Sequence, residues 1–245
     1  MKKVFITGAN KSIGFETARQ LAKEDHYIYL GSRDREKGEE AVEKLRQEGI
    51  TNVEAITIDI SKPASVAKAR EALGAKTGVL DILINNAGIS GGFPQPASST
   101  DLKTIREVFD TNFFGTINVT QAFLDLLKKS EKPVIINVTS GLASLTLQND
   151  PSWQFYKSKS AAYGPSKTAL NAYTIALAYE LRDTSFKINA VDPGYTATDF
   201  NKHSGHNDVG TAASHILKIA LSDKTGPTGK YISWDNNPSS GDSPW

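Results

Sequence analysis

Cysteine is absent from this 245-residue sequence, and histidine occurs only four times. The lack of cysteine excludes disulfides and thiolate metal centres, and four histidines leave few ligands for a zinc site. No apolar run approaches the roughly 18 residues of a membrane span, and the basic start is followed by too short an apolar run for a signal peptide. We therefore expect a cytoplasmic protein that needs no metal and does not enter a membrane.

Neither sign of charge dominates, since 28 basic and 27 acidic residues give a formal net charge of +1. The charges alternate along predicted helices such as residues 34–48, so no basic stripe for nucleic acid is present. A chain of this length can bury one large core, and no Pro/Gly/Ser-rich or charged linker divides it. We expect a single domain over residues 1–245 with a small-molecule partner.

Short β-rich runs alternate with longer helical patterns along the chain. Strands are predicted at residues 4–7, 27–30, 53–58, 80–85, 134–139, 187–191 and 231–233, and helices at 12–23, 34–48, 63–75, 101–129, 161–183 and 208–221. Such alternation requires right-handed crossovers between parallel strands. The sequence thus predicts an α/β fold, a Rossmann-type doubly wound sheet of seven parallel strands with helices on both faces and ligands at the strands' carboxyl ends. Residues 90–100 are predicted to be a loop, and the polar segment 236–245 a frayed tail.

The first predicted strand runs directly into a turn, residues 7–14, that contains two glycines and opens a helix. Such a turn can bring backbone N–H groups and the positive end of a helix to a pyrophosphate. An ordinary strand–helix turn would use Gly8 and Gly14 equally well. The turn is therefore a candidate phosphate site that needs support from the rest of the chain.

Tyr163 and Lys167 stand four residues apart in a predicted helix, which places their Cβ atoms about 5–6 Å apart on one face. An ammonium about 4 Å from a phenol, in an effective dielectric of about 20, lowers the phenol pKa by some three units at most. The pair could then exchange protons near neutral pH. The same spacing is common by chance, however, in a surface tyrosine beside a solvated lysine.

The order of several motifs resembles that of short-chain dehydrogenases/reductases. The motifs are T-G-x-x-x-x-x-G at residues 7–14, N-N-A-G at 85–88, Asn112, Ser140, the pair Tyr163/Lys167 and the turn Pro193-Gly194. The segments NKSIG and LGSRD are similar to those of NADPH-dependent carbonyl reductases. The resemblance covers nearly the whole chain. It implies that about residues 1–90 mainly bind the cofactor and about 91–235 supply the catalytic residues and the substrate pocket.

The resemblance also implies catalytic roles. Tyr163 would exchange a proton with the substrate oxygen, Lys167 would lower the pKa of Tyr163 and hold the nicotinamide ribose, and Ser140 would hold the substrate oxygen. Asn112 would bend its helix and hold a water beside Lys167, or it is a satisfied core asparagine. Thr139 is the rival hydroxyl at the end of the fifth strand, but neighbouring strand residues face opposite sides, which favours Ser140.

A nicotinamide dinucleotide is the implied cofactor, and the end of the second strand favours NADP(H). The run Gly31-Ser32-Arg33 offers no carboxylate for a ribose diol, and Arg33 and Lys11 supply two cations for a 2′-phosphate, unless Arg33 pairs with Asp34 or Glu36. Ser12 departs from the family's usual middle glycine and puts a side chain near the phosphates. A tight turn would also explain Pro193-Gly194. The implied cofactor site comprises Gly8, Asn10, Lys11, Ser12, Ile13, Gly14, Arg33, Asp59, Ile60, Asn86, Ala87, Gly88, Tyr163, Lys167, Pro193, Gly194, Thr196 and Thr198.

We therefore expect an enzyme that reversibly reduces a ketone or aldehyde with NADPH. The alternatives are an NAD-linked alcohol or steroid dehydrogenase and a non-catalytic NADP(H)-binding sensor or scaffold. Residues 141–162 form an apolar-rich insertion that either covers a hydrophobic substrate or covers the helical surface through which many relatives form tetramers, so a monomer and a homo-oligomer both stay open. Aromatic and histidine side chains that could complete the pocket, or simply pack, are Phe93, Tyr195, Phe200, His203 and His206.

Overall fold

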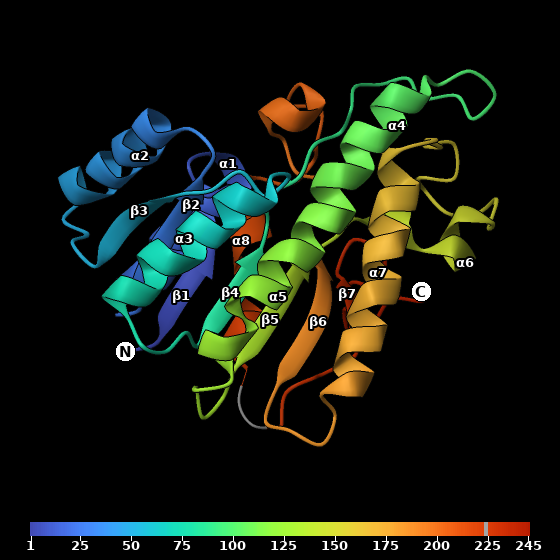
Figure 1. Cartoon of the computed structure of the whole chain (residues 1–245). Helices are drawn as coiled ribbons and strands as arrows, with labels where there is room; N and C mark the ends of the chain where they lie inside the picture. Colours follow the sequence, from blue (N-terminus) through green and yellow to red (C-terminus); the bar gives the residue numbers. More distant parts are fainter. Residues whose placement is uncertain (223–224) are drawn as a thin grey trace.

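The computed structural model describes residues 1–222 and 225–245. Their centre is a sheet flanked by helices on both faces (Figure 1). Its strands are β1 (Lys3–Ile6), β2 (Tyr27–Ser32), β3 (Val53–Thr57), β4 (Ile82–Asn85), β5 (Val134–Val138), β6 (Lys187–Asp192) and β7 (Tyr231–Ser233). They run parallel in the order β3-β2-β1-β4-β5-β6-β7, which confirms the predicted Rossmann-type sheet. The strand order reverses between β1 and β4, and α/β proteins bind ligands at the carboxyl ends beside such a point.

The continuous apolar runs of the central strands are explained by burial on both faces. Val4 and Ile6 of β1 pack in the cluster under α1 (Ser12–Lys23), α2 (Arg35–Gln47) and α8 (Val209–Ala220). Phe5, between them, points to the other face, where its ring centroid lies 4.8 Å from that of Phe123. That face is covered by α3 (Pro63–Lys76), α5 (Thr116–Leu127) and α7 (Tyr163–Glu180). Because side chains alternate along each strand, one run of apolar residues contributes to both cores.

The single helix expected at residues 101–129 is wrong in one respect, because the structure divides it. It consists of α4 (Leu102–Phe109), a π-helical segment η1 (Asp110–Gly115) and α5. The wider turn places Asn112 fully buried beside the loop after β4. A Cβ on Gly115 would lie 3.0 Å from the carbonyl oxygen of Ile60, so the helix passes very close to that backbone. π-Helical turns inside α-helices are frequent at functional sites.

The C-terminal segment 236–245 is docked, so the expectation of a frayed tail is wrong. The carbonyl oxygen of Trp245 accepts hydrogen bonds from the backbone N–H (3.2 Å) and the hydroxyl (2.9 Å) of Thr146. The Trp245 ring lies 5.6 Å from that of Tyr231, and Asp242 forms an antiparallel bridge with Ile232. These long-range contacts hold a segment whose polar composition suggested none.

Residues 141–162 contain two short helices that the sequence did not indicate, η2 (Gly141–Ala143) and α6 (Leu145–Gln148). Figure 1 shows α6 beside α7 and near the C-terminus.

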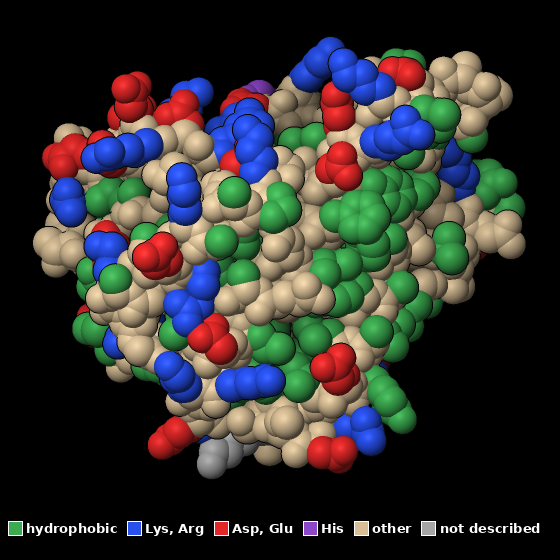
Figure 2. Space-filling view, in the orientation of Figure 1, with side chains coloured by type: hydrophobic (Ala, Val, Ile, Leu, Met, Phe, Trp, Pro, Cys, Tyr) green, Lys and Arg blue, Asp and Glu red, His purple; other side chains and the backbone are tan. Residues whose placement is uncertain are grey.

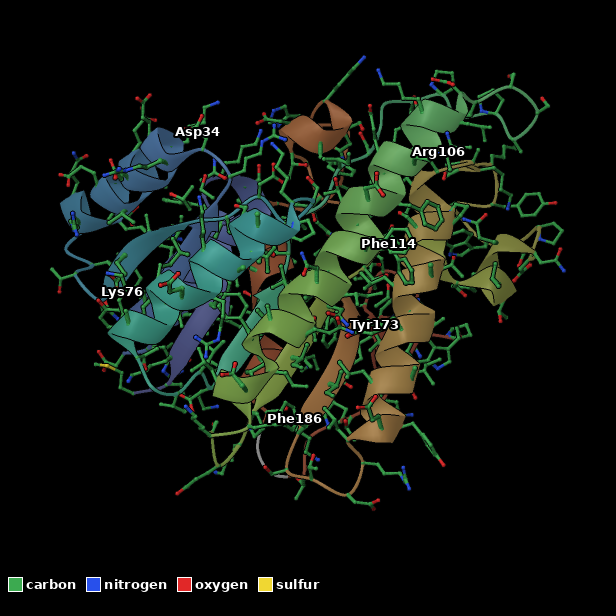
Figure 3. The ribbon with its side chains drawn as sticks, in the orientation of Figure 1. Asp34, Lys76, Arg106, Phe114, Tyr173 and Phe186 are labelled. Carbon is green, nitrogen blue, oxygen red and sulfur yellow. The ribbon has the colours of Figure 1, made fainter. Side chains whose placement is uncertain are left out.

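Figure 2 shows hydrophobic side chains gathered over the neighbouring face formed by α4, α5 and α7. Phe114 on η1 and Ile175 and Tyr179 on α7 are exposed, and Figure 3 shows Phe114 and Tyr173 on the same side. In the parts of the chain that the structure describes, no helix is both long and apolar enough to cross a membrane.

Candidate active site

The predicted catalytic side chains meet at the carboxyl ends of β5 and β6. Tyr163 begins α7, and its phenol lies close enough to the side chain of Ser140, which follows β5, for Ser140 to lower the pKa of the phenol. Lys167 lies one turn further along α7, is buried, and donates from Nζ to the carbonyl oxygen of Val138 (2.8 Å). The hydroxyl of Thr139 instead donates to Asn171 Oδ1 (2.8 Å). The two hydroxyls at the end of β5 therefore diverge, as strand alternation requires, and Ser140 is the one that contacts the phenol.

The electrostatics of the pair differ from the sequence-based expectation. Burial raises the pKa of Tyr163, the hydrogen bond with Ser140 opposes this, and Asp192 raises the pKa further. Burial likewise lowers the pKa of Lys167 to about 8. We expected Lys167 to lower the pKa of Tyr163, but desolvation of the phenol outweighs any such attraction. The phenol is therefore neutral at neutral pH, which is the form that can donate a proton.

Asn112 joins the loop after β4 to α7. Its Nδ2 donates to the carbonyl oxygen of Ile89 (2.9 Å) and to Ser166 Oγ (3.1 Å), and its Oδ1 accepts from the Ile89 N–H (2.8 Å). These bonds fit the alternative of a satisfied core asparagine. A Cβ on Gly88 would lie 3.2 Å from Asn112 Oδ1 and 3.5 Å from Lys167 Nζ. Gly88 thus lets the loop after β4 approach η1 and α7 closely.

The glycine turn after β1 is packed against the loop after β4. Gly8 has a φ of +63°, and a Cβ there would lie 2.9 Å from Ala87 Cα; a Cβ on Gly14 would lie 2.6 Å from the Gly8 carbonyl oxygen. Asn86 Nδ2 donates to the carbonyl oxygens of Thr7 (2.9 Å) and Gly8 (3.0 Å). Asn86 and Ala87 therefore fix the shape of the turn.

Ser12 opens α1 with a φ of +52°, in the left-handed region that favours glycine. This explains why a glycine is usual at this position. Within the described residues, Lys11 at the N-cap makes no side-chain capping bond and the first turn of α1 holds no acidic residue. By contrast, Asp34 and Asp208 cap α2 and α8. The free N–H groups and positive end of α1 fit an anionic group such as a pyrophosphate.

The two cations expected at a 2′-phosphate have different surroundings. Lys11 Nζ pairs with Asp199 Oδ2 (2.9 Å), and both side chains are more than half exposed. Arg33 is exposed and forms no ion pair among the described residues. Asp34 caps α2 and lies 3.7 Å from Lys37 rather than pairing with Arg33. Arg33 is therefore available to a ligand, whereas Lys11 is shared with Asp199.

The remaining predicted cofactor residues surround these groups. Asp59 accepts from the backbone N–H (3.1 Å) and hydroxyl (2.7 Å) of Ser61, so part of its acceptor capacity is used locally. Ile60 is buried, and Asn10 and Ile13 are half-buried within the glycine turn. Asn10 lies on the loop after β1, Ile13 in the first turn of α1, and Asp59 and Ile60 on the loop after β3.

The loop after β6 begins with the turn at Pro193-Gly194. Gly194 has a φ of +88°, and a Cβ there would lie 2.8 Å from Asp235 Oδ1, so this turn requires glycine. The hydroxyl of Thr196 donates to the Gly194 carbonyl oxygen (3.0 Å), and Thr198 caps the short helix η3 (Asp199–Asn201). Both threonines are buried and take part in the local structure of the loop.

Aromatic side chains flank the catalytic phenol. The Phe93 and Phe200 ring centroids lie 6.2 and 5.2 Å from that of Tyr163, and these two phenylalanines are 53% and 40% exposed. Phe155 contacts Tyr195 (5.8 Å) and stacks with His206 (6.4 Å) in an adjoining group. His203 lies 3.1 Å from Asp199 instead. The phenol therefore lies between two partly exposed apolar rings.

The family model described as short chain dehydrogenase matches residues 2–208. The chain belongs to the short-chain dehydrogenase family. A (+)-neomenthol dehydrogenase of Capsicum annuum is 32% identical, with 93% of this chain and 94% of the relative covered.

Two solved structures are similar to this short-chain dehydrogenase over nearly their whole lengths. Salutaridine reductase from Papaver somniferum superposes with a TM-score of 0.83 at 28% identity, covering 94% of this chain and 99% of the other. An NADPH-bound carbonyl reductase from chicken fatty liver gives a TM-score of 0.84 at 26% identity, covering 100% and 99%. The chain is thus an oxidoreductase of a family that includes ketone-acting reductases.

Two buried residues near the site of this dehydrogenase were not among the residues predicted from its sequence. Gln95, in the predicted loop, is buried and accepts at Oε1 from the N–H groups of Ala162 (3.2 Å) and Tyr163 (3.0 Å), so it caps the start of α7. A polar residue in a Gly/Pro/Ser-rich loop does not by itself indicate that it caps a distant helix. Asp192 ends β6 and is also buried. Its place at the carboxyl end of a central strand could have marked it.

Proposed function

We propose that the chain is an NADP(H)-dependent reductase of ketones or aldehydes, with Tyr163 as its general acid and base. The convergence of Ser140, Tyr163 and Lys167 at the carboxyl end of β5 is the observation that carries the proposal. It places a neutral phenol and a second hydroxyl at the carboxyl edge of the sheet, where a carbonyl oxygen could bind both. The uncapped start of α1 provides an anion site at the same edge.

The chain's own residues would hold the substrate and move one proton. Ser140 orients the carbonyl oxygen, and Tyr163 donates its phenolic proton to that oxygen. Lys167, with a pKa of about 8, is close enough to neutrality to return a proton to the phenolate. NADPH, when bound, supplies the hydride that reduces the carbonyl carbon.

The preference for NADP(H) is proposed from the end of β2. Gly31 and Ser32 offer no carboxylate to the adenosine ribose, and Arg33 is exposed without an ion pair among the described residues. A guanidinium in this position suits a 2′-phosphate. The chicken carbonyl reductase that superposes on this chain is NADPH-bound, which supports the assignment by analogy.

An apolar carbonyl compound is the substrate class that the aromatic surroundings favour. Phe93 and Phe200 approach Tyr163 from two different loops and expose much of their rings. A hydrophobic substrate between them would remove these rings from water while its oxygen reached Tyr163. The names of the plant relatives, neomenthol dehydrogenase and salutaridine reductase, point in the same direction.

The decisive assay follows the loss of NADPH or NADH absorbance with a panel of aromatic, cyclic and aliphatic carbonyls. Tyr163→Phe should abolish turnover and keep NADPH binding, because it removes the proton donor and preserves the ring. Arg33→Ala should raise the Michaelis constant for NADPH far more than that for NADH. Equal effects on both cofactors would refute the NADP(H) preference. Tight NADPH binding without turnover of any carbonyl would instead favour a sensor or scaffold.

A further inference from the structure

A short buried hydrogen-bond network is centred on the carboxylate of Asp192. It is the last residue of β6 and is 4% exposed. Its Oδ2 accepts from the hydroxyl of Ser233 on β7 (2.6 Å), and its Oδ1 accepts from the backbone N–H of Gly194 (3.1 Å). The backbone N–H of Gly141 also acts on this carboxylate, and a Cβ on Gly141 would lie 3.2 Å from Asp192 Oδ2. Three donors from three segments thus meet on a single side chain.

Two of these segments carry proposed functional residues. Gly141 directly follows Ser140, which lies close to the Tyr163 phenol. Gly194 forms the turn after β6, on the loop that leads to Phe200. The Ser140 backbone is held a second time, because the buried Tyr231 hydroxyl donates to its carbonyl oxygen (2.8 Å). Moving the carboxylate would therefore disturb the position of Ser140 and of the substrate-side loop together.

Four titratable groups interact with Asp192 through charge. They are Tyr163 and Lys167 on α7, Tyr231 on β7 and Asp235 after β7. The negative charge of Asp192 raises the pKa of Tyr163, Lys167 and Tyr231, and that of Asp235 raises the pKa of Asp192. The chemistry of Tyr163 and Lys167 is thus coupled to the ionisation of this one acid.

We propose that Asp192 is a positioning residue of the active site, whose ionised carboxylate links the segment after Ser140 to the turn at Gly194. The inference rests on the proposed reductase function. Ionised, both oxygens accept and all three donors are satisfied. Protonated, the carboxyl carries a hydrogen on one oxygen and accepts more weakly, so the link is loosened.

This link predicts an acidic limb in the pH profile. Burial raises the pKa of Asp192 to about 6, while hydrogen bonds from Ser233, Gly194 and Gly141 oppose the rise. The turnover number should therefore fall as the pH drops through about 6. Removing one hydrogen-bond donor while keeping Asp192 should move the acidic limb to higher pH, because the pKa of Asp192 then rises further.

The experiment compares the pH dependence of kcat and kcat/KM in three variants of the full chain. Asp192→Asn should lower kcat about 10-fold or more at pH 7.5 and remove the acidic limb. Ser233→Ala should keep the limb and shift it to higher pH. Asp81→Asn is the matched control, because Asp81 also accepts from one backbone N–H (Lys3, 2.8 Å) and one serine hydroxyl (Ser130, 2.6 Å), but at the amino ends of the strands. It should leave the limb in place.

A second measurement needs no turnover, so it separates this inference from the proposed function. Amide hydrogen exchange at Gly141 and Gly194 should be faster in Asp192→Asn than in the wild type, and unchanged in Asp81→Asn, because the amide side chain has only one acceptor oxygen. If no carbonyl is reduced, the proposed function fails while this readout still tests the link. Unchanged exchange, or a wild-type limb and kcat in Asp192→Asn, would overturn the inference.

Discussion

Replacing Ser12 with glycine should stabilise the protein, because Ser12 holds a φ of +52° at the start of α1. A left-handed backbone costs an L-residue roughly 1–2 kcal/mol, and glycine loses up to about 1 kcal/mol through its freer unfolded chain. The net gain is about 0.5–1 kcal/mol. For a chain of this size that corresponds to a rise in Tm of about 1–4 °C.

The control for this substitution is Ser12→Ala, which removes the hydroxyl and keeps the strained backbone. Calorimetry should show a Tm within about 1 °C of the wild type for alanine and a higher Tm for glycine. If the Ser12 hydroxyl donates to a cofactor phosphate, both variants should bind NADPH about two- to tenfold more weakly in a fluorescence titration. A Tm for Ser12→Gly at or below that of Ser12→Ala would refute the strain argument. Unchanged affinity and turnover in both would show that the hydroxyl has no role.

Three further changes test the surroundings of the site. Gln95→Ala removes the cap of α7, so urea unfolding should show a free energy of unfolding lower by about 1–3 kcal/mol, and kcat should fall as well. Wild-type values of both quantities would contradict the capping role. Asp199→Asn breaks an exposed ion pair, so stability should hardly change, whereas the released Lys11 should lower the Michaelis constant for NADPH at low salt. A raised constant would show that Asp199 assists binding. Lys167→Met removes a group whose pKa is lowered from 10.5 to about 8 on folding. The wild type releases this proton earlier when folded, so its stability relative to Lys167→Met should rise between pH 8 and 10.5, and a flat difference would refute the shift.

Much of the architecture was predictable from local pattern. The β1, β4 and β5 runs are apolar without alternation because helices cover both faces of the sheet, and this pattern needs no tertiary information. The four-residue spacing of Tyr163 and Lys167 and the two glycines after β1 are likewise local features. They indicated the fold and the position of the site because helix and turn geometry depend on near neighbours.

Other features depend on residues that are distant in sequence. The π-helical turn at Asn112 forms where that side chain meets Ile89 and Ser166. The docking of Trp245 depends on its hydrogen bonds with Thr146. The ion pair of Lys11 with Asp199 joins the turn after β1 to the loop after β6. The two partners of each contact are too far apart in the sequence for a local pattern to include both. The expected fraying of the tail failed because polar composition was taken to mean solvation.

The ordered motifs of the chain thus determined its family, its parallel sheet and the identity of the side chains at the carboxyl edge, because each follows from residue type and short-range spacing. The protonation behaviour of that edge was decided only by the tertiary structure. Burial raises the pKa of Tyr163 and lowers that of Lys167, and Asp192 reaches both across strands, because desolvation and charge depend on what surrounds a group in space.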